Sequence, residues 1–191
     1  MNKLILTDCD GVLLNWMFAF DAWLTSRGYK RVINDEYNVA KSYGITKDEG
    51  YRLVRAFNES DSIGYLPPHR DAVHYIGKLH EEHGYVFRVI TSLSLDPYAK
   101  ELRERNLRKL FGTAIEQVIC LDTGEDKDAA LLPFKDSGMC WIEDKEENAL
   151  LGTDLGLESL LMEHGYNTNC QTVPLVRNWK DVHDRLLNSY K

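Results

Sequence analysis

The sequence predicts an α/β fold: a parallel sheet of about five strands with helices on both faces and a small α-helical cap inserted after the first strand. Three observations support this fold class. Short continuous apolar runs are typical of strands buried on both faces of a parallel sheet. Segments with helix-start signals separate most of these runs, and strands that alternate with helices pair in parallel. The stretch between the first two runs is too long for a single crossover helix.

The expected strands are apolar runs of ordinary strand length. They are Leu4–Leu6, Tyr85–Ile90, Ile115–Leu121, Met139–Ile142 and Leu157–Met162. Helix-start signals stand between or after them, because aspartate and asparagine are good N-cap residues. These signals are Asp96 followed by Pro97, Asp126, and Asn178 before the final helix.

The stretch between the first two strands contains several helix signals of its own. We expect helices over Asn15–Ser26, over Asp35–Ser42, from a capping box at Thr46, and after the pair Pro67-Pro68. Residues 1–14 and 84–191 are therefore expected to form a Rossmann-like core. Residues 15–83 are expected to form the helical cap, with its last helix returning to the core.

The composition is that of a globular chain with an acidic balance. Hydrophobic residues are 43% of the 191 residues and charged residues 28%, which suffices for a core. The net charge of −7 argues against polymeric nucleic acid as a partner, although a small phosphorylated molecule is compatible. No stretch approaches the roughly 18 apolar residues that span a membrane. The four scattered cysteines suit a reducing compartment, so we expect a cytoplasmic protein; its oligomeric state is left open.

Polar side chains follow the predicted strands at their carboxyl ends. They are Asp8 and Asp10 after the first strand, Thr91-Ser92 after the second, Lys127 after the third, and Glu143-Asp144 after the fourth. Ligands bind at this edge of an open parallel sheet, so these groups are expected to converge. Two carboxylates about 4 Å apart repel by roughly 4 kcal/mol at an effective dielectric of 20, so either pKa values rise or a cation joins them. Few ligands, all of them oxygen, suit Mg²⁺ shared with a substrate phosphate.

The stretch DCDGVLL, which begins at Asp8, resembles the DxDGxxL signature of the haloacid dehalogenase-like superfamily. Further motifs follow in that family's order. Thr91 in VITS resembles the second motif, Lys127 in EDKDAALL the third, and Glu143-Asp144 in WIEDKEEN the fourth. The resemblance spans roughly residues 3–166, and the insertion falls where phosphatases of that family carry a small helical cap.

The resemblance implies a role for each motif residue. Asp8 would be the nucleophile that forms an aspartyl-phosphate. Asp10 would be the general acid and then the general base, and its spacing from Asp8 puts both side chains on one side of an extended chain. Thr91 would bind phosphoryl oxygens and Lys127 would neutralise their charge. Gly11 would allow the sharp turn after the acids.

The resemblance also implies a magnesium site and neighbouring substrate contacts. The ion would be held by the Asp8 side chain, the Asp10 backbone carbonyl and Asp144, with Glu143 bound directly or through water. Ser92 and Gly11 would lie against the substrate. An aspartate at position 10 favours phosphate esters, because the dehalogenating branch of the family lacks this second acid.

The aromatic segment after the first motif allows two interpretations. Trp16, Phe20 and Trp23 have the helical spacing of packing residues. The same helix begins beside the catalytic acids, so Asn15, Trp16 and Phe18 are candidates for substrate contact. An aromatic helix after DGVL also resembles the 5′(3′)-deoxyribonucleotidase branch, in which aromatic side chains stack on a nucleobase.

Simpler interpretations exist for each motif residue taken alone. Asp8 and Asp10 could belong to a surface turn, Thr91 could be an ordinary strand-end hydroxyl, and Glu143-Asp144 an exposed helix start. Lys135 is a rival to Lys127 as the catalytic lysine.

Taken together, the motifs predict a magnesium-dependent phosphomonoester hydrolase for a small soluble phosphate, such as a (deoxy)nucleoside monophosphate. One alternative is a phosphomutase or phosphotransferase of the same superfamily. Another is a non-enzymatic phospho-acceptor domain resembling a response-regulator receiver, in which Asp122 after the third strand would accept the phosphoryl group.

Overall fold

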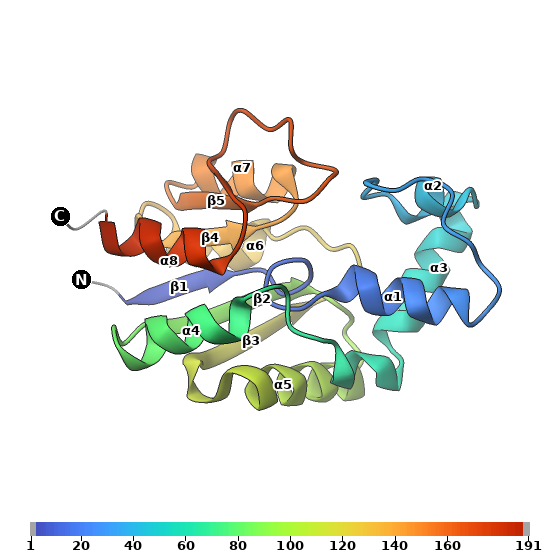
Figure 1. Cartoon of the computed structure of the whole chain (residues 1–191), viewed down its shortest axis with the longest axis horizontal. Helices are drawn as coiled ribbons and strands as arrows, with labels where there is room; N and C mark the ends of the chain where they lie inside the picture. The colour runs from blue at the N-terminus through green and yellow to red at the C-terminus, as the bar shows by residue number, and fades with distance from the viewer. Residues whose placement is uncertain (1–2, 189–191) are drawn as a thin grey trace.

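The computed structural model describes residues 3–188 and contains one six-stranded, all-parallel sheet in the order β3-β2-β1-β4-β5-β6 (Figure 1). Residues 1–2 and 189–191, which the expected core segments include, lie outside the described part. The strands are β1 Leu4–Thr7, β2 Val86–Ser92, β3 Ile115–Leu121, β4 Cys140–Glu143, β5 Glu158–Met162 and β6 Leu175–Val176. The predicted α/β class with a parallel sheet is confirmed.

The sheet has one strand more than the sequence predicts. The additional strand, β6, is two residues long and pairs with the edge strand β5 through Leu161↔Leu175 and Met162↔Val176. Two residues are too few to produce an apolar run or an alternating pattern, so this strand arises from pairing with β5 and has no sequence signal of its own.

The order of the strands determines where a ligand site can form. β1 is central and pairs with β2 on one side and β4 on the other. Thr7 at the end of β1 is in register with Val89 and with Ile142. The chain therefore leaves the carboxyl end of β1 between the ends of β2 and β4, at the point where the strand order reverses.

Two layers of helices cover the sheet, because successive side chains of a strand point to opposite faces. Ile5 of β1 packs in the cluster that includes α4 (Ala72–Glu81), α5 (Pro97–Phe111) and α8 (Trp179–Asn188). Its neighbour Leu6 packs in the opposite cluster with α6 (Asp128–Leu131) and α7 (Glu146–Asp154). The described residues also form three short 3-10 helices: η1 Asp61–Tyr65, η2 Gly112–Ala114 and η3 Leu132–Phe134.

Most of the predicted helix starts occur, with one exception. The side chains of Asp96 and Asn178 accept backbone N–H groups of Ala99 and Asp181 at 2.8 and 3.0 Å and so cap α5 and α8. The expected cap at Asp126 is wrong: α6 begins at Asp128 without a side-chain cap. The reason is that Lys127 occupies the N-cap position, with its side chain paired to Asp8, so Asp126 lies one residue before the cap.

The remaining helices, α1 (Trp16–Thr25), α2 (Val39–Tyr43) and α3 (Lys47–Asn58), lie beyond the carboxyl ends of the strands, on the right in Figure 1. Aromatic rings connect α1 with α3, because Phe57 of α3 meets Phe20 at 5.3 Å and Trp23 at 5.5 Å. Within α1, Trp16 stacks on Phe20 with centroids 4.4 Å apart. α2 is shorter than the predicted Asp35–Ser42.

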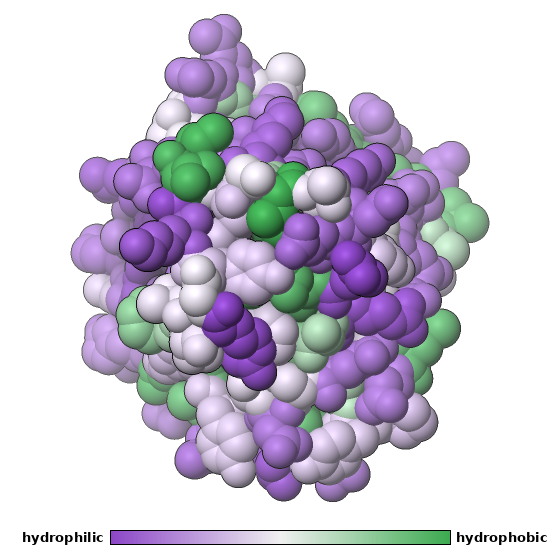
Figure 2. Space-filling model, turned by 90° about the vertical axis from the view of Figure 1, so that its right-hand side faces the viewer, coloured by the Kyte–Doolittle hydropathy of each residue, from purple (hydrophilic) through white to green (hydrophobic). Residues whose placement is uncertain are grey.

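The outer face of this end is mainly hydrophilic, with apolar side chains scattered singly (Figure 2). α4 packs against α5 and α8 of the core layers. The division into a core and a cap over residues 15–83 stays a prediction. Within residues 3–188, no helix combines the length and apolar character needed to cross a bilayer.

Candidate active site

The loop after β1 is built by backbone hydrogen bonds and a glycine. The N–H of Asp8 donates to the Ile142 carbonyl at 2.8 Å, which ties the end of β1 to β4. Gly11 has φ of 81°, a conformation that side chains rarely adopt. A Cβ at this position would lie 2.4 Å from Oδ2 of Asp144. Only glycine therefore allows this loop to approach Asp144, the acid that follows β4.

Three buried carboxylates meet at the carboxyl ends of β1 and β4. Asp8, Glu143 and Asp144 can each direct one oxygen so that all three oxygens lie within 4.8 Å of one another. Their residues are 7%, 1% and 6% exposed, so water screens their repulsion poorly. The structure thus brings together the acids of the first and fourth motifs.

Lys127 is the cation of this cluster. Its Nζ lies 2.7 Å from Oδ1 of Asp8 and 3.3 Å from Oε2 of Glu143, and the side chain is buried. Burial alone lowers the pKa of Lys127, but Asp8 and Glu143 outweigh burial and raise that pKa above its ordinary value. The rival Lys135 is exposed and does not line the cavity described below.

The charges of this cluster fit a divalent cation. Burial raises the pKa of Glu143, with repulsion from Asp8 adding to it, and the same causes raise the pKa of Asp144 to about 7. One lysine does not balance three carboxylates. The donor set consists entirely of oxygens, which is what Mg²⁺ prefers. The residues present therefore suit the expected magnesium ion.

Neighbouring side chains orient these acids. Asn148 donates from Nδ2 to Oε1 of Glu143 at 2.6 Å. The hydroxyl of Tyr166 donates to Oδ2 of Asp144, and Asn167 donates to the Asp144 backbone carbonyl at 2.8 Å. Such contacts hold a ligand's oxygen in a fixed direction.

Asp10, the second acid of the first motif, pairs with Arg103 and not with Lys127. Arg103 of α5 donates from Nη1 to Oδ1 of Asp10 at 2.5 Å and from Nη2 to Oδ2 at 3.1 Å. The sequence interpretation missed Arg103, which stands in the charged stretch KELRERNLRKL. The signal that could have found it is its helical spacing, because Arg103 lies on the buried face of α5 with Ala99, Leu102 and Leu107.

The residues of the second motif line the same site. Thr91 is 1% exposed, and its Oγ1 has no hydrogen-bond partner among the described residues. A buried hydroxyl without a partner is costly unless a ligand completes it. The hydroxyl of Ser92 is instead engaged, because it donates to the Glu125 carbonyl at 2.7 Å.

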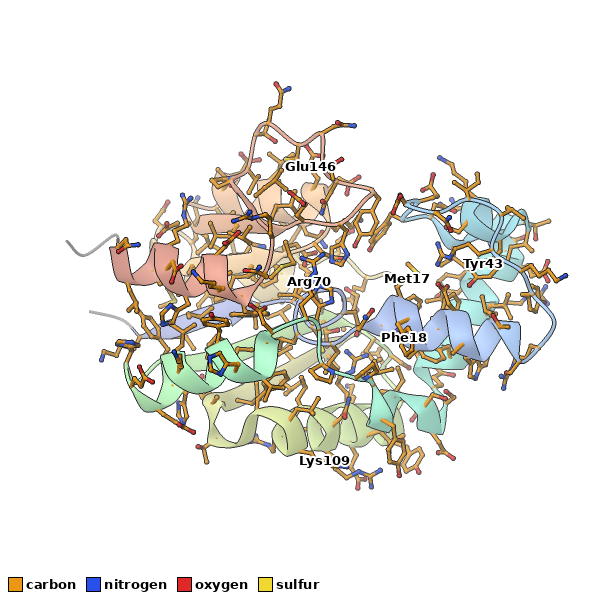
Figure 3. All side chains as sticks on the ribbon, in the orientation of Figure 1. Met17, Phe18, Tyr43, Arg70, Lys109 and Glu146 are labelled. Carbon is orange, nitrogen blue, oxygen red and sulfur yellow. The ribbon has the colours of Figure 1, made fainter. Side chains whose placement is uncertain are left out.

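A cavity of about 930 Å³ joins the acids to the helices over the strand ends. Its lining includes all the predicted site residues, namely Asp8, Asp10, Gly11, Asn15, Trp16, Phe18, Thr91, Ser92, Lys127, Glu143 and Asp144. Phe18 is 64% exposed and Trp16 is partly packed against Phe20. Figure 3 shows Phe18 and Met17 on α1 at the side of the molecule that carries this cavity.

Asn15 has a structural contact as well as a place on the cavity wall. Its Oδ1 accepts the N–H of Phe18 at 3.3 Å and so caps α1. Trp16 donates from Nε1 to Oδ1 of Asn58 at 2.9 Å, which connects α1 to α3. Both residues therefore shape the cavity through their packing.

Several cavity residues lie outside the sequence motifs. His164 donates from Nε2 to the Gly11 carbonyl at 2.8 Å and stacks on Tyr166 with centroids 5.0 Å apart. His69 is buried beside His164, and burial, together with His164 and Arg70, lowers the pKa of His69 to about 3. The sequence did not predict this pair, because 94 residues separate His69 from His164 along the chain.

Comparison with known proteins finds one protein similar in sequence and several solved structures similar in fold; no family model matches the chain. An uncharacterised 32.4 kDa protein from the Gp30–rIII intergenic region of enterobacteria phage T4 is 29% identical over 199 residues, covering 98% of this chain and 71% of that protein.

Similar solved structures have low identity and nearly full coverage. A haloacid dehalogenase-like family hydrolase from Streptococcus pneumoniae has a TM-score of 0.66 at 14% identity, covering 100% of this chain and 99% of its own. An L-2-haloacid dehalogenase from Xanthobacter autotrophicus has a TM-score of 0.64 at 11% identity, covering 100% of both chains. CbbY from Rhodobacter sphaeroides, crystallised with phosphate, has a TM-score of 0.59 at 16% identity, covering 94% of this chain and 95% of its own. At these identities the likeness concerns the fold.

Proposed function

We propose that this chain, which has the haloacid dehalogenase-like α/β fold, is a magnesium-dependent phosphomonoester hydrolase that works through an aspartyl-phosphate intermediate. The observation that carries the proposal is the buried cluster in which Asp8 lies 2.7 Å from the Lys127 ammonium, beside Glu143 and Asp144 and open to the cavity. A nucleophilic carboxylate, a fixed cation and a set of oxygen donors are what phosphoryl transfer requires.

Asp8 is assigned as the nucleophile. Its carboxylate attacks phosphorus, a bond forms between the Asp8 oxygen and phosphorus, and the bond from phosphorus to the leaving oxygen breaks. Lys127 stays protonated, because its pKa is raised, and its ammonium neutralises charge on Asp8 and on the incoming phosphoryl group. The unpartnered hydroxyl of Thr91 is available to donate to a phosphoryl oxygen.

Asp10 is assigned to proton transfer. It gives a proton to the leaving alcohol in the first step, and in the second step it takes a proton from the water that attacks the aspartyl-phosphate. A second acid two residues after the nucleophile supports phosphate chemistry over dehalogenation, even though a dehalogenase is among the proteins of similar fold.

Asp8, Asp144 and the backbone carbonyl of Asp10 would hold the magnesium ion. When bound, the ion would supply positive charge that offsets the charge of the phosphoryl group and the crowded carboxylates. Glu143 already accepts hydrogen bonds from Asn148 and Lys127. We therefore assign Glu143 to holding Lys127 in place, with contact to the ion directly or through water.

The substrate is proposed to be a small phosphorylated molecule, with a (deoxy)nucleoside monophosphate as the leading candidate. A cavity of about 930 Å³ is within the range of sites for molecules of that size. Phe18 and Tyr51 line it and are 64% and 49% exposed, so flat apolar surface is available to a ring of the substrate.

The test is a screen of phosphate monoesters, including nucleotides and sugar phosphates, with and without magnesium. We expect phosphate release that needs the ion and that falls at least 1000-fold in Asp8→Asn, because this change removes the nucleophile. Asp126→Asn, which alters an exposed acid of the loop before Lys127, is the matched control and should retain activity. A screen without magnesium-dependent release would contradict the proposal.

The same screen separates the alternatives. Transfer of the phosphoryl group to a second sugar hydroxyl, with little release into water, would indicate a phosphomutase or phosphotransferase. Stable phosphorylation without turnover would indicate a receiver-like domain. The acid this last alternative needs, Asp122, lies 3.7 Å from Arg55 and is not part of the cluster of Asp8, Glu143 and Asp144.

A further inference from the structure

We propose that Arg103 is the positioning residue for Asp10: it fixes the direction of the carboxylate that exchanges protons with the leaving group and with water. This inference rests on the proposed hydrolase function. Its basis is a two-point contact in which Nη1 and Nη2 of Arg103 reach Oδ1 and Oδ2 of Asp10 at 2.5 and 3.1 Å. A planar guanidinium holding both oxygens fixes the plane of the carboxylate, which a point charge cannot do.

The two partners differ in exposure in a way that suits this role. The side chain of Arg103 is 0% exposed and that of Asp10 is 22% exposed. Asp10 lines the cavity, whereas Arg103 is not among the residues that line it. The arginine therefore holds the carboxylate without occupying the space that a substrate would use.

Arg103 also contacts the residue between the two catalytic acids. Its Nη1 lies 2.7 Å from the Sγ of the buried Cys9. Arg103 thus contacts two neighbouring residues of the loop, Cys9 and Asp10. Asp8 is held separately, by Lys127 and by the Ile142 carbonyl. Arg103 therefore sets where the Asp10 carboxylate lies relative to Asp8 and to the leaving oxygen.

The helix that carries Arg103 makes a second hydrogen bond to a distant segment of the chain. One turn later on α5, Asn106 donates from Nδ2 to the Leu66 carbonyl at 3.0 Å. Asp10 precedes α1, and Leu66 follows α3 and η1, so α5 contacts the chain before and after these helices. Asp10 is therefore held by a helix that lies outside residues 15–83, the predicted cap.

The proton carried by Asp10 matters most when the leaving alcohol is strongly basic. An alkyl phosphate needs that proton as its bond to phosphorus breaks, whereas 4-nitrophenol leaves readily as an anion. A misdirected Asp10 should therefore slow alkyl phosphates more than aryl phosphates. A residue that only stabilises the fold would slow both equally.

The experiment compares Arg103→Lys with the wild type on an alkyl phosphate and on 4-nitrophenyl phosphate at saturating magnesium. Lysine keeps the buried positive charge and loses the second contact. We expect kcat to fall about 100-fold for the alkyl ester, within the range of general acid catalysis, and only a few-fold for the aryl ester. Lys109→Met is the control, because Lys109 is exposed on the same helix (Figure 3), and it should change neither value.

A second measurement protects the test from effects on folding. In an Asp10→Asn background, Arg103→Lys should produce no further fall in aryl phosphate turnover, because residues that act as a unit are not additive. Equal losses on both esters, no loss on either, or a full additional loss in the Asp10→Asn background would each overturn the positioning role while leaving the hydrolase intact. A wild type that hydrolyses neither ester would overturn the proposed function, and the positioning role with it.

Discussion

Lys127 and Asp8 form an ion pair that is almost completely removed from water, with side chains 3% and 9% exposed. Removing two charges from water costs several kcal/mol each, and their attraction seldom yields a large net gain in stability. The geometry of the pair is therefore better explained by the chemistry proposed for Asp8 than by stabilisation of the fold. The same reasoning applies to Glu143, which shares the ammonium.

Lys127→Met tests this interpretation at a single residue. The change leaves the carboxylates of Asp8 and Glu143 without their cation, so we expect a loss of about 3 kcal/mol in the free energy of unfolding. Activity should fall about 1000-fold, because a fixed charge at the phosphoryl group is lost. Denaturant unfolding and phosphate release are the measurements. Lys135→Met, at the exposed rival position, should leave both unchanged.

Gly11→Ala tests whether the close contact between Gly11 of the first motif and Asp144 of the fourth is needed for activity. The added Cβ would meet Oδ2 of Asp144 at 2.4 Å and would also be strained at φ of 81°. We expect weaker magnesium binding and a fall in turnover of about 100-fold, because the acids must separate. The measurements are a magnesium titration and kcat.

Gly28→Ala is the matched control for Gly11→Ala. Gly28 has φ of 86°, but no atom lies within 4 Å of an added Cβ. This variant should lose about 1 kcal/mol of stability from backbone strain and keep its activity. Equal effects on magnesium binding in the two variants would show that strain, not contact with Asp144, is responsible.

At the scale of elements, α7 determines where β4 delivers its two acids. The helix packs closely on β4 and β5. A Cβ added at Gly152 would lie 2.4 Å from Cδ1 of Trp141 and 2.6 Å from Oγ of Ser159. Trp141 belongs to β4 and donates from Nε1 to the Asn148 carbonyl at 3.1 Å. The position of Glu143 thus depends on close helix–sheet packing.

Gly152→Ala is expected to destabilise the protein although alanine is the better helix former. Overpacking against Trp141 should cost about 2 kcal/mol, which exceeds the gain in helix propensity. Gly77→Ala in α4 is the matched control, because nothing lies within 4 Å of its Cβ, and it should stabilise by about 0.5 kcal/mol. Thermal unfolding of the two variants is the measurement, and a more stable Gly152→Ala would contradict the packing argument.

At the scale of the whole molecule, the acidic cluster exists only in the folded chain. Asp8 and Asp144 are far apart in the sequence, so a cation that binds them together binds the native state and not the unfolded one. Such binding stabilises the native state by an amount that grows with the concentration of the cation.

Magnesium should therefore raise the unfolding temperature. At about 100 times its dissociation constant the ion would add about 2.7 kcal/mol, which for a chain of this size corresponds to a rise of roughly 5–10 °C. The measurement is thermal unfolding with and without MgCl₂, and it does not depend on any substrate. Asp144→Asn should abolish the rise, whereas Asp154→Asn at an exposed position should retain it. An equal rise in both variants would mean that the ion binds elsewhere.

The features that could be predicted from the sequence are those with a local signal. Apolar runs such as Ile115–Leu121 indicated the parallel sheet, because a strand buried on both faces must be apolar throughout. The cap at Asp96 lies within one helical turn of its partner. The motif around Asp8 indicated the edge of the sheet at which the candidate site lies, since parallel strands deliver their carboxyl ends to one edge.

Other features were decided by the tertiary structure. The two-residue β6 exists because β5 offers an unpaired edge, and Lys127 rather than Lys135 reaches Asp8 because α6 starts where its chain turns inward. Arg103 and Asp10 meet only after α5 packs on the sheet. A local pattern reports what a segment prefers, whereas the partner of a buried charge depends on which distant segments the core brings into contact.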